Sequence, residues 1–291
     1  MKRVFRPTFV AAGSLAAGLG AFGCGSSDKV VSGPQPIEIQ FAARLGSEPF
    51  ACGQEYQGLG TTGSSGTPMD GRFYVSDIHF VNPDESERFV TLEQDGEWQL
   101  DDVALLDFED GSAGCAAEGT PATNTSIRGT VDPGTAAKIH FTVGVPFALN
   151  HGDATTAEPP LDQTPMFWSW NFGYKFLKVE LATTGQPSGF FVHVGSTGCE
   201  GDGAGNVSSC SEPNRVDAEI PLANGFDASR DTVVLDIAKL LEDSDVDVNT
   251  PETAPGCMSF PGDPECPAIF AHLGLPFGEQ AGGTQDVFSV E

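Results

Sequence analysis

Short runs of alternating apolar and polar residues, separated by turns rich in glycine and proline, recur from residue 37 to the end of the chain. Alternation of this kind places successive side chains on opposite faces of a β-strand. The 36 glycines and 21 prolines leave few stretches with a helical period. The pattern predicts an all-β fold, either an antiparallel β-sandwich or a partly open barrel with long loops and one or two short helices. The predicted strands are 37–43, 72–81, 88–93, 103–108, 126–131, 137–145, 166–181, 190–195, 216–220 and 232–236. Short helices are expected at 237–242 and 267–273, and long loops at 58–70 and 150–165.

An aromatic run lies inside the predicted strand 166–181. Every second residue is a ring: Trp168, Trp170, Phe172, Tyr174 and Phe176. In one continuous strand these five rings would form a column on a single face. The apolar residues that follow Phe176 fall on the opposite parity, which predicts a bulge there. The column is interpreted either as the inner face of a sandwich or as a binding site.

The first residues indicate export. Residues 1–23 have a basic start and a short apolar segment, as in a signal peptide. They end in Ala21, Phe22 and Gly23, which together with Cys24 resemble a bacterial lipobox. Cys24 is therefore expected to carry a lipid, followed by a flexible tether over 24–36 and a single β domain over 37–291. The alternative is an ordinary signal peptide in which Cys24 is incidental.

Six further cysteines predict disulfides, because an even number of cysteines in an exported chain is typical of a disulfide framework. They permit 15 pairings, and the sequence does not choose among them. Two pairs are close in sequence, Cys199 with Cys210 and Cys257 with Cys266. Cys52 and Cys115 would then pair by elimination. No Cys-x-x-Cys spacing supports a zinc site.

The formal net charge of the whole chain is −27, and removing Lys2, Arg3 and Arg6 with the signal segment leaves about −30. This charge excludes nucleic acid as a main partner. The sequence also contains neither a Gly-x-Ser-x-Gly elbow nor a His-Glu-x-x-His motif, so hydrolase chemistry has no support. We therefore expect a binding protein and not an enzyme.

Five histidines offer nitrogen ligands, which exported copper proteins use. His193 lies in a predicted strand that leads into a disulfide loop, and His151 lies where a strand runs into a long loop. His79, His140 and His272 are interpreted as ordinary surface or core residues.

Several segments, matching in order over residues 37–288, resemble the MbnP-type proteins of metallo-mystery pair systems, which are exported four-cysteine-motif proteins. The matching segments are DGRFYVSD at 70–77, LLDFED at 105–110, FTVGVPF at 141–147, NH at 150–151, MFWSW at 166–170, GYKF at 173–176 and GSTGC at 195–199. The Trp-x-Trp core shows no departure from the family pattern. Cysteines beyond four would be additions in this chain.

The resemblance implies a copper-binding protein of the periplasm or outer membrane, with a di-haem partner of the cytochrome c peroxidase/MauG type. In such a protein Trp168 would be oxidised to kynurenine and would bind one copper ion, as Cu(I), together with His193 and His151. Trp170 would pack beside the site or pass an oxidising hole toward Trp168. Membrane contact would be through the lipid anchor alone. Two alternatives remain, a carbohydrate-binding module that stacks sugars on the aromatic strand and a purely structural surface lipoprotein.

Overall fold

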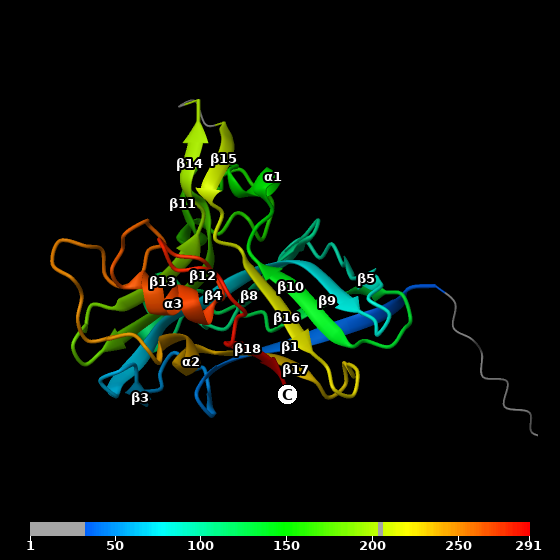
Figure 1. Cartoon of the computed structure of the whole chain (residues 1–291), viewed down its shortest axis with the longest axis horizontal. Helices are drawn as coiled ribbons and strands as arrows, with labels where there is room; N and C mark the ends of the chain where they lie inside the picture. Colours follow the sequence, from blue (N-terminus) through cyan, green and yellow to red (C-terminus); the bar gives the residue numbers. More distant parts are fainter. Residues whose placement is uncertain (1–32, 203–205) are drawn as a thin grey trace, which may run out of the picture. The chain divides into compact units, whose positions relative to one another are not determined.

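The computed structural model describes residues 33–202 and 206–291, and these residues form an all-β fold as predicted (Figure 1). The expected signal peptide 1–23, the lipidation site Cys24 and the tether as far as residue 32 lie outside the described residues. Strand β1 already begins at Gln35, so the tether predicted over 24–36 ends earlier than expected. Within the described ranges, no helix is both long and apolar enough to cross a membrane.

Within the described residues, the strands form two main sheets and a separate hairpin. The first sheet contains, in spatial order, β18 (Phe288–Val290), β17 (Thr232–Asp236), β1 (Gln35–Leu45), β9 (Ser126–Val131) and β6 (Thr91–Leu92), with β2 (Glu48–Pro49) beside β1. Strands β1 and β17 run parallel, whereas β1 and β9 are antiparallel.

The second sheet is centred on the long strand β4 (Ser64–Val81). Its main path is β11 (Phe167–Ser169), β12 (Gly173–Thr183), β4, β10 (Lys138–Val143) and β16 (Val216–Pro221). Attached to this path are β13 (Phe190–Gly195), β3 (Tyr56–Leu59), β5 (Glu87–Phe89), β7 (Gln99–Leu100) and β8 (Val103–Asp107). The hairpin consists of β14 (Thr197–Gly201) and β15 (Val207–Glu212).

The core lies where the two sheets face each other, as in a sandwich. Phe41 of β1 is buried and contacts Phe73 of β4 and Phe141 of β10, with ring centroids 6.3 and 5.7 Å apart. Phe288 of β18 meets Phe141 edge-on at 5.3 Å. These edge-on contacts between large rings hold the two sheets together, and the residues that make them are far apart in the sequence.

The short helices lie between strands. They are α1 (Phe147–Asn150), α2 (Ile237–Leu241), α3 (Cys266–His272) and the 3-10 turns η1 (Ala113–Ala117) and η2 (Thr164–Met166). Helices α2 and α3 were predicted, whereas α1 was not and ends at Asn150, where the expected loop 150–165 begins. The loop predicted at 58–70 is wrong, because β3 and β4 form a hairpin there, turning at Gly60–Gly63.

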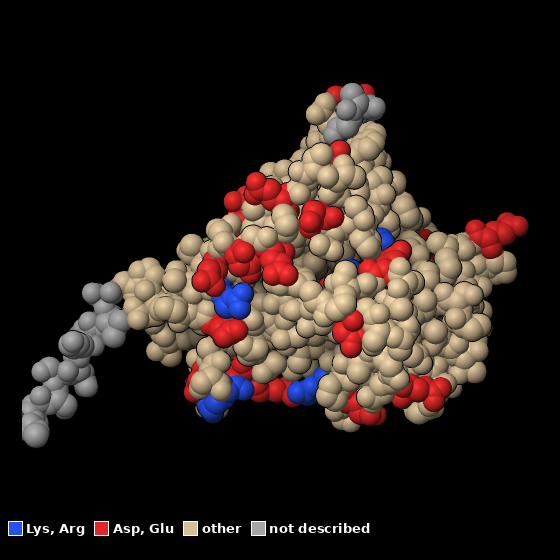
Figure 2. Space-filling view, turned by 180° about the vertical axis from the view of Figure 1, so that it is seen from behind, with Lys and Arg blue, Asp and Glu red and all other residues tan. Residues whose placement is uncertain are grey.

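The described cysteines form the disulfides Cys52–Cys115, Cys199–Cys210 and Cys257–Cys266. These are the pairs favoured by spacing and elimination. Acidic side chains gather in patches on the face shown in Figure 2, with few basic side chains between them. The surface therefore shows the negative charge expected from the sequence.

Candidate metal centre

The aromatic run forms a hairpin, so the single strand predicted over 166–181 is wrong, as is its column of five rings. Strand β11 ends at Ser169, residues 170–172 turn, and β12 begins at Gly173. Gly173 has φ = 78°, and a Cβ there would approach Asn150 Oδ1 to 2.3 Å, so a side chain is excluded at this position. The bulge predicted near Phe176 is present, since the register between β12 and β13 shifts between Lys175 and Leu177.

The turn sends the five rings into different surroundings. Tyr174 and Phe176 are fully buried in the core, whereas Trp170 is 38% exposed. Phe172 contacts Phe260 edge-on at 5.2 Å. Trp168 is partly buried and lies against β13. Trp168 and Trp170, although two residues apart, are therefore not equivalent.

Trp168 packs on a surface made for a flat ring. A Cβ at Gly195 would come within 2.7 Å of the indole Cζ3, so only glycine lets the ring approach β13 this closely. The ring centroid of Trp168 is 6.2 Å from that of His193 and 6.1 Å from that of Phe260. The structure thus brings together Trp168 and His193, both of which the family resemblance implied as site residues.

The ring of His193 is fixed by a stacking contact and a hydrogen bond. Its ring stacks on Phe191 at 5.6 Å with an interplanar angle of 6°, and its Nε2 lies 2.7 Å from Glu180 Oε1. Because a carboxylate only accepts, Nε2 carries the hydrogen and donates to Glu180. Nδ1 then carries the lone pair, and it has no hydrogen-bond partner among the described residues. A histidine fixed in this way by a carboxylate is typical of metal ligands.

A third segment, 257–260, closes the site. Cys257 exchanges backbone hydrogen bonds with β13, donating to Phe191 O and accepting from His193 N–H. Ser259 Oγ donates to His193 O at 2.8 Å and accepts from Gly195 N–H at 3.2 Å. The disulfide Cys257–Cys266 ties this segment to α3, and the segment carries Phe260 to the indole of Trp168.

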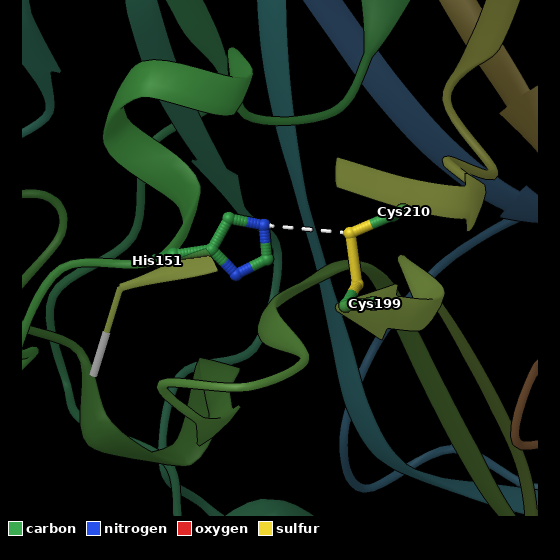
Figure 3. A group of neighbouring side chains, drawn as sticks. All are labelled: His151, Cys199 and Cys210. Carbon is green, nitrogen blue, oxygen red and sulfur yellow. Dashed lines mark hydrogen bonds between the residues drawn. A yellow bond between two sulfur atoms is a disulfide. The ribbon is translucent and has the colours of Figure 1, made fainter. Parts of the chain in front are cut away.

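His151 lies at the turn of the hairpin, after α1, and not against Trp168. Its Nδ1 donates to Trp170 O at 3.1 Å, so Nε2 carries the lone pair and accepts from Asn150 Nδ2 at 3.2 Å. The same Nε2 points toward Cys210 Sγ at 3.6 Å (Figure 3). Cys210 and Cys199 are bonded to each other and offer no thiolate to a metal.

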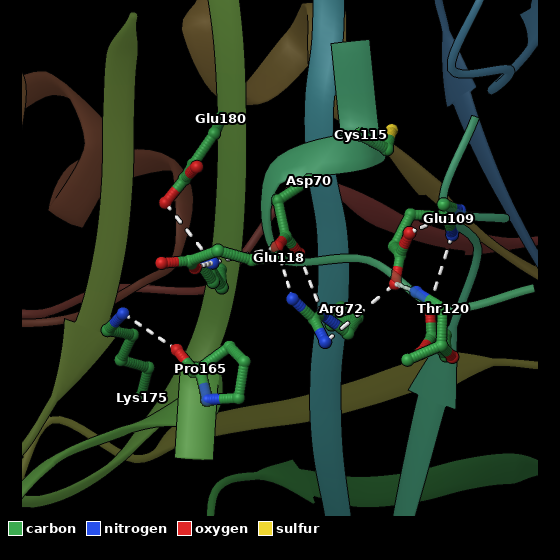
Figure 4. A network of polar contacts seen from close by, with 12 residues as sticks. Asp70, Arg72, Glu109, Cys115, Glu118, Thr120, Pro165, Lys175 and Glu180 are labelled. Carbon is green, nitrogen blue, oxygen red and sulfur yellow. Dashed lines mark hydrogen bonds and ion pairs between the residues drawn. The ribbon is translucent and has the colours of Figure 1, made fainter. Parts of the chain in front are cut away.

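A network of charged side chains, most of them buried, extends from Glu180 on β12 to Asp70 and Arg72 on β4 (Figure 4). Glu180 Oε1 lies 3.4 Å from Lys178 Nζ, which lies 2.7 Å from Asp70 Oδ2. Asp70 accepts two hydrogen bonds from the guanidinium of Arg72, whose other edge lies 3.8 Å from Glu109. This network was not predicted from the sequence, although its charged residues lie two apart on each strand, Asp70 and Arg72 on β4 and Lys178 and Glu180 on β12.

Burial and pairing set the charge states at the site. Burial lowers the pKa of His193, and the hydrogen bond to Glu180 offsets this only in part, which favours a neutral imidazole. Burial would raise the pKa of Glu180, but His193 and Lys178 outweigh it and the net shift is downward. Burial also lowers the pKa of His151. Both imidazoles are thus favoured in the neutral form that a metal requires.

The imidazoles of His193, beside Trp168, and of His151, at the turn of the hairpin, fit copper in their donor chemistry. In each imidazole one nitrogen is fixed as a donor and the other carries a lone pair. Nitrogen ligands of this kind suit copper. The indole of Trp168 contributes no lone pair, since its nitrogen is a donor only. A third ligand at Trp168 therefore requires a chemical change in that residue.

Comparisons with known proteins agree on one family. A family model named MbnP matches residues 34–259. Among solved structures, MbnP from Methylosinus trichosporium is 31% identical in sequence, with a TM-score of 0.76, and the match covers 89% of this chain and 98% of that one. No curated protein sequence matches the chain.

Proposed function

This chain belongs to the MbnP family, and from that premise we propose that it is an exported copper-binding protein, not an enzyme, that acts in copper homeostasis. It binds one copper ion, as Cu(I), after Trp168 is oxidised to kynurenine by a di-haem partner of the cytochrome c peroxidase/MauG type. Cys24 carries a lipid and anchors the protein in the periplasm or at the outer membrane. His193 is the first imidazole ligand, and His151 is the second.

The observation that carries this proposal is the pairing of Trp168 with His193. Their rings are neighbours at 6.2 Å, and Glu180 leaves the His193 lone pair on Nδ1. Gly195 removes the side chain that would separate the indole from β13. A metal-bound histidine has its second ring nitrogen tied to a carboxylate in this way.

Oxidation of Trp168 would supply the missing ligand. Two peroxide equivalents add two oxygen atoms across the C2–C3 bond of the pyrrole ring, cleave it and leave two waters. One further water then removes the formyl carbon as formate. The product carries an aromatic amine beside an aryl ketone. This amine is weakly basic and unprotonated at neutral pH, so it offers the neutral nitrogen that the indole lacks, and such a nitrogen suits Cu(I).

The alternative of a carbohydrate platform has less support. Sugar stacking needs several exposed rings on one face, and the hairpin separates the rings of the aromatic run. Tyr174 and Phe176 are fully buried. Of the five rings in the run, Trp170 is the one that is exposed, at 38%.

The two tryptophans of the hairpin give a matched test. W168F and W170F would each be produced together with the di-haem partner, and copper would be measured per protein chain. We expect W168F to lose nearly all bound copper, because the ring that is converted into a ligand is gone. W170F should keep most of it, since Trp170 is exposed and contributes its backbone carbonyl to His151. Equal copper in W168F and the unaltered chain would refute the proposed site.

A further inference from the structure

His79 and His140 face each other on neighbouring strands of the second sheet, away from the residues around Trp168. They are register partners on β4 and β10, and their rings stack with centroids 4.3 Å apart at 30°. The register shifts immediately beyond His140, and Asp77 has φ = 54° there. This bulge turns Asp77 toward the pair, with its Oδ1 lying 3.7 Å from His79 Nδ1.

Hydrogen bonds fix which nitrogen of each ring carries a lone pair. His79 Nδ1 lies 3.0 Å from the carbonyl oxygen of Asp77, so Nδ1 is the donor and Nε2 has the lone pair. His140 Nε2 pairs with the Asp217 carboxylate, which leaves the lone pair on Nδ1. His140 Nδ1 is buried and has no partner among the described residues. Among the described residues, each imidazole therefore has one nitrogen tied to an oxygen and one with no hydrogen-bond partner, as metal-bound histidines have before the ion binds.

Three potential metal ligands and an acidic groove meet at this point. One ligand atom from each of Asp77, His79 and His140 lies within 4.8 Å of the others. The cluster opens into a groove of about 1120 Å³ whose lining includes Arg215 as its one Lys or Arg residue among the described residues. Carboxylates dominate that lining: Asp77, Glu85, Glu87, Asp102, Glu212, Asp217 and Glu219. Such a groove concentrates cations near the histidines.

We propose that His79, His140 and Asp77 form a second metal site, for a divalent first-row transition ion such as Zn²⁺ or Cu²⁺. Two imidazoles and a carboxylate select these ions over Ca²⁺ and Mg²⁺, which prefer oxygen ligands. The site goes beyond the proposed function, since it shares no residue with the Trp168 site and needs no oxidised tryptophan. Strand β4 passes both sites, pairing with β12 through residues 66–73 and with β10 through residues 75–81.

Equilibrium dialysis of the mature chain, produced without the di-haem partner, tests this site. Zn²⁺ would be the probe, with millimolar Ca²⁺ present to occupy the acidic groove. We expect about one Zn²⁺ per chain, and binding weakened about 100-fold or more in H79Q and in H140Q. In D77N, which changes a side chain that is 47% exposed, we expect Zn²⁺ binding to weaken less than in either histidine variant.

H272Q is the matched control. His272 is also buried and also lies among carboxylates, with Nδ1 2.9 Å from Asp286 and Nε2 3.2 Å from Asp243. It lacks a second imidazole, so we expect Zn²⁺ binding in H272Q to equal that of the unaltered chain. With Cu²⁺ as the probe, electron paramagnetic resonance should show two nitrogen ligands and lose them in H79Q/H140Q. Zn²⁺ binding that survives in folded H79Q/H140Q, or is absent from the unaltered chain, would overturn the proposal.

Discussion

Glu180 determines which nitrogen of His193 is free. Because it accepts the hydrogen bond from Nε2, Nδ1 is the nitrogen that can bind a metal. The carboxylate lies 2.7 Å from Nε2 and is itself held by Lys178 at 3.4 Å. Lys178 is fully buried, so its charge is compensated by Asp70, Glu118 and Glu180 rather than by water. Charged groups in such surroundings are costly unless each has its partner. The network behind the site therefore keeps Glu180 ionised and in place.

Asp107 gives a prediction at the residue scale. It is 3% exposed, and burial raises its pKa to about 8, although Arg72 opposes the shift. The unfolded chain releases this proton near pH 4. Between about pH 4 and pH 8 the folded state therefore holds one proton more, and Asp107 makes the free energy of unfolding fall as pH rises. In D107N this contribution should disappear, up to about 1.4 kcal/mol per pH unit.

Urea unfolding at a series of pH values measures this slope. D110N is the control, because Asp110 is exposed and hydrogen bonds from Ser112 lower its pKa. The slope in D110N should match that of the unaltered chain between pH 5 and 7.5. If the slope in D107N is also unchanged, Asp107 is ionised in the folded protein and the account of its burial is wrong.

Sequence reasoning reached some residues of the site and missed others. Trp168, His151 and His193 were selected because they lie in family-like segments. The resemblance implied that Trp168 and His193 share a copper site. Glu180 was not selected, because its position beside His193 depends on the register that pairs Lys178 with His193 across β12 and β13. Phe260 was also not selected. It reaches Trp168 because segment 257–260 lies along β13, and nothing in the sequence indicates that these two segments are neighbours.

At the scale of elements, the β11–β12 hairpin shows why strict alternation misled the prediction. Rings at every second residue are compatible with a strand, and the pattern continues unbroken through the turn at 170–172. The residue that marks the end of the turn is Gly173. Its backbone is in the left-handed region, and Asn150 leaves no room for a side chain at this position. Asn150 lies 23 residues earlier, and its approach was not visible in the sequence.

The disulfide Cys257–Cys266 gives a prediction at this scale. It fixes the segment that carries Phe260 to Trp168, and it closes a short loop whose removal costs about 3 kcal/mol in the chain-entropy model. In C257S/C266S, prepared with W98F and W170F so that Trp168 alone emits, we expect red-shifted fluorescence and easier quenching by iodide. Phe260 and segment 257–260 would no longer shield the indole.

The control for that experiment is C199S/C210S in the same background. This pair joins β14 to β15 and contacts His151, whereas Trp168 is packed by other residues. Its emission should stay close to that of the parent. Equal spectral shifts in both variants would mean that segment 257–260 does not shield Trp168.

At the scale of the whole molecule, the fold class followed from the alternating runs, and the disulfide pairs from proximity and elimination. The arrangement of strands did not follow. Strand β1 pairs in parallel with β17, nearly two hundred residues later, and β4 contacts strands from every part of the domain. Such long-range pairings depend on how the two sheets bury their shared core, which local periodicity does not specify.

The central claim is that Trp168, and not Trp170, becomes a metal ligand by oxidation. Peptide mass spectrometry of the protein produced with its di-haem partner tests it most directly. We predict that the peptide containing both tryptophans is about 4 Da heavier, through gain of oxygen and loss of carbon. Fragmentation should place the change on Trp168, with copper bound in proportion to it. An unmodified Trp168 in copper-loaded protein would contradict the account, and copper would then be held without kynurenine.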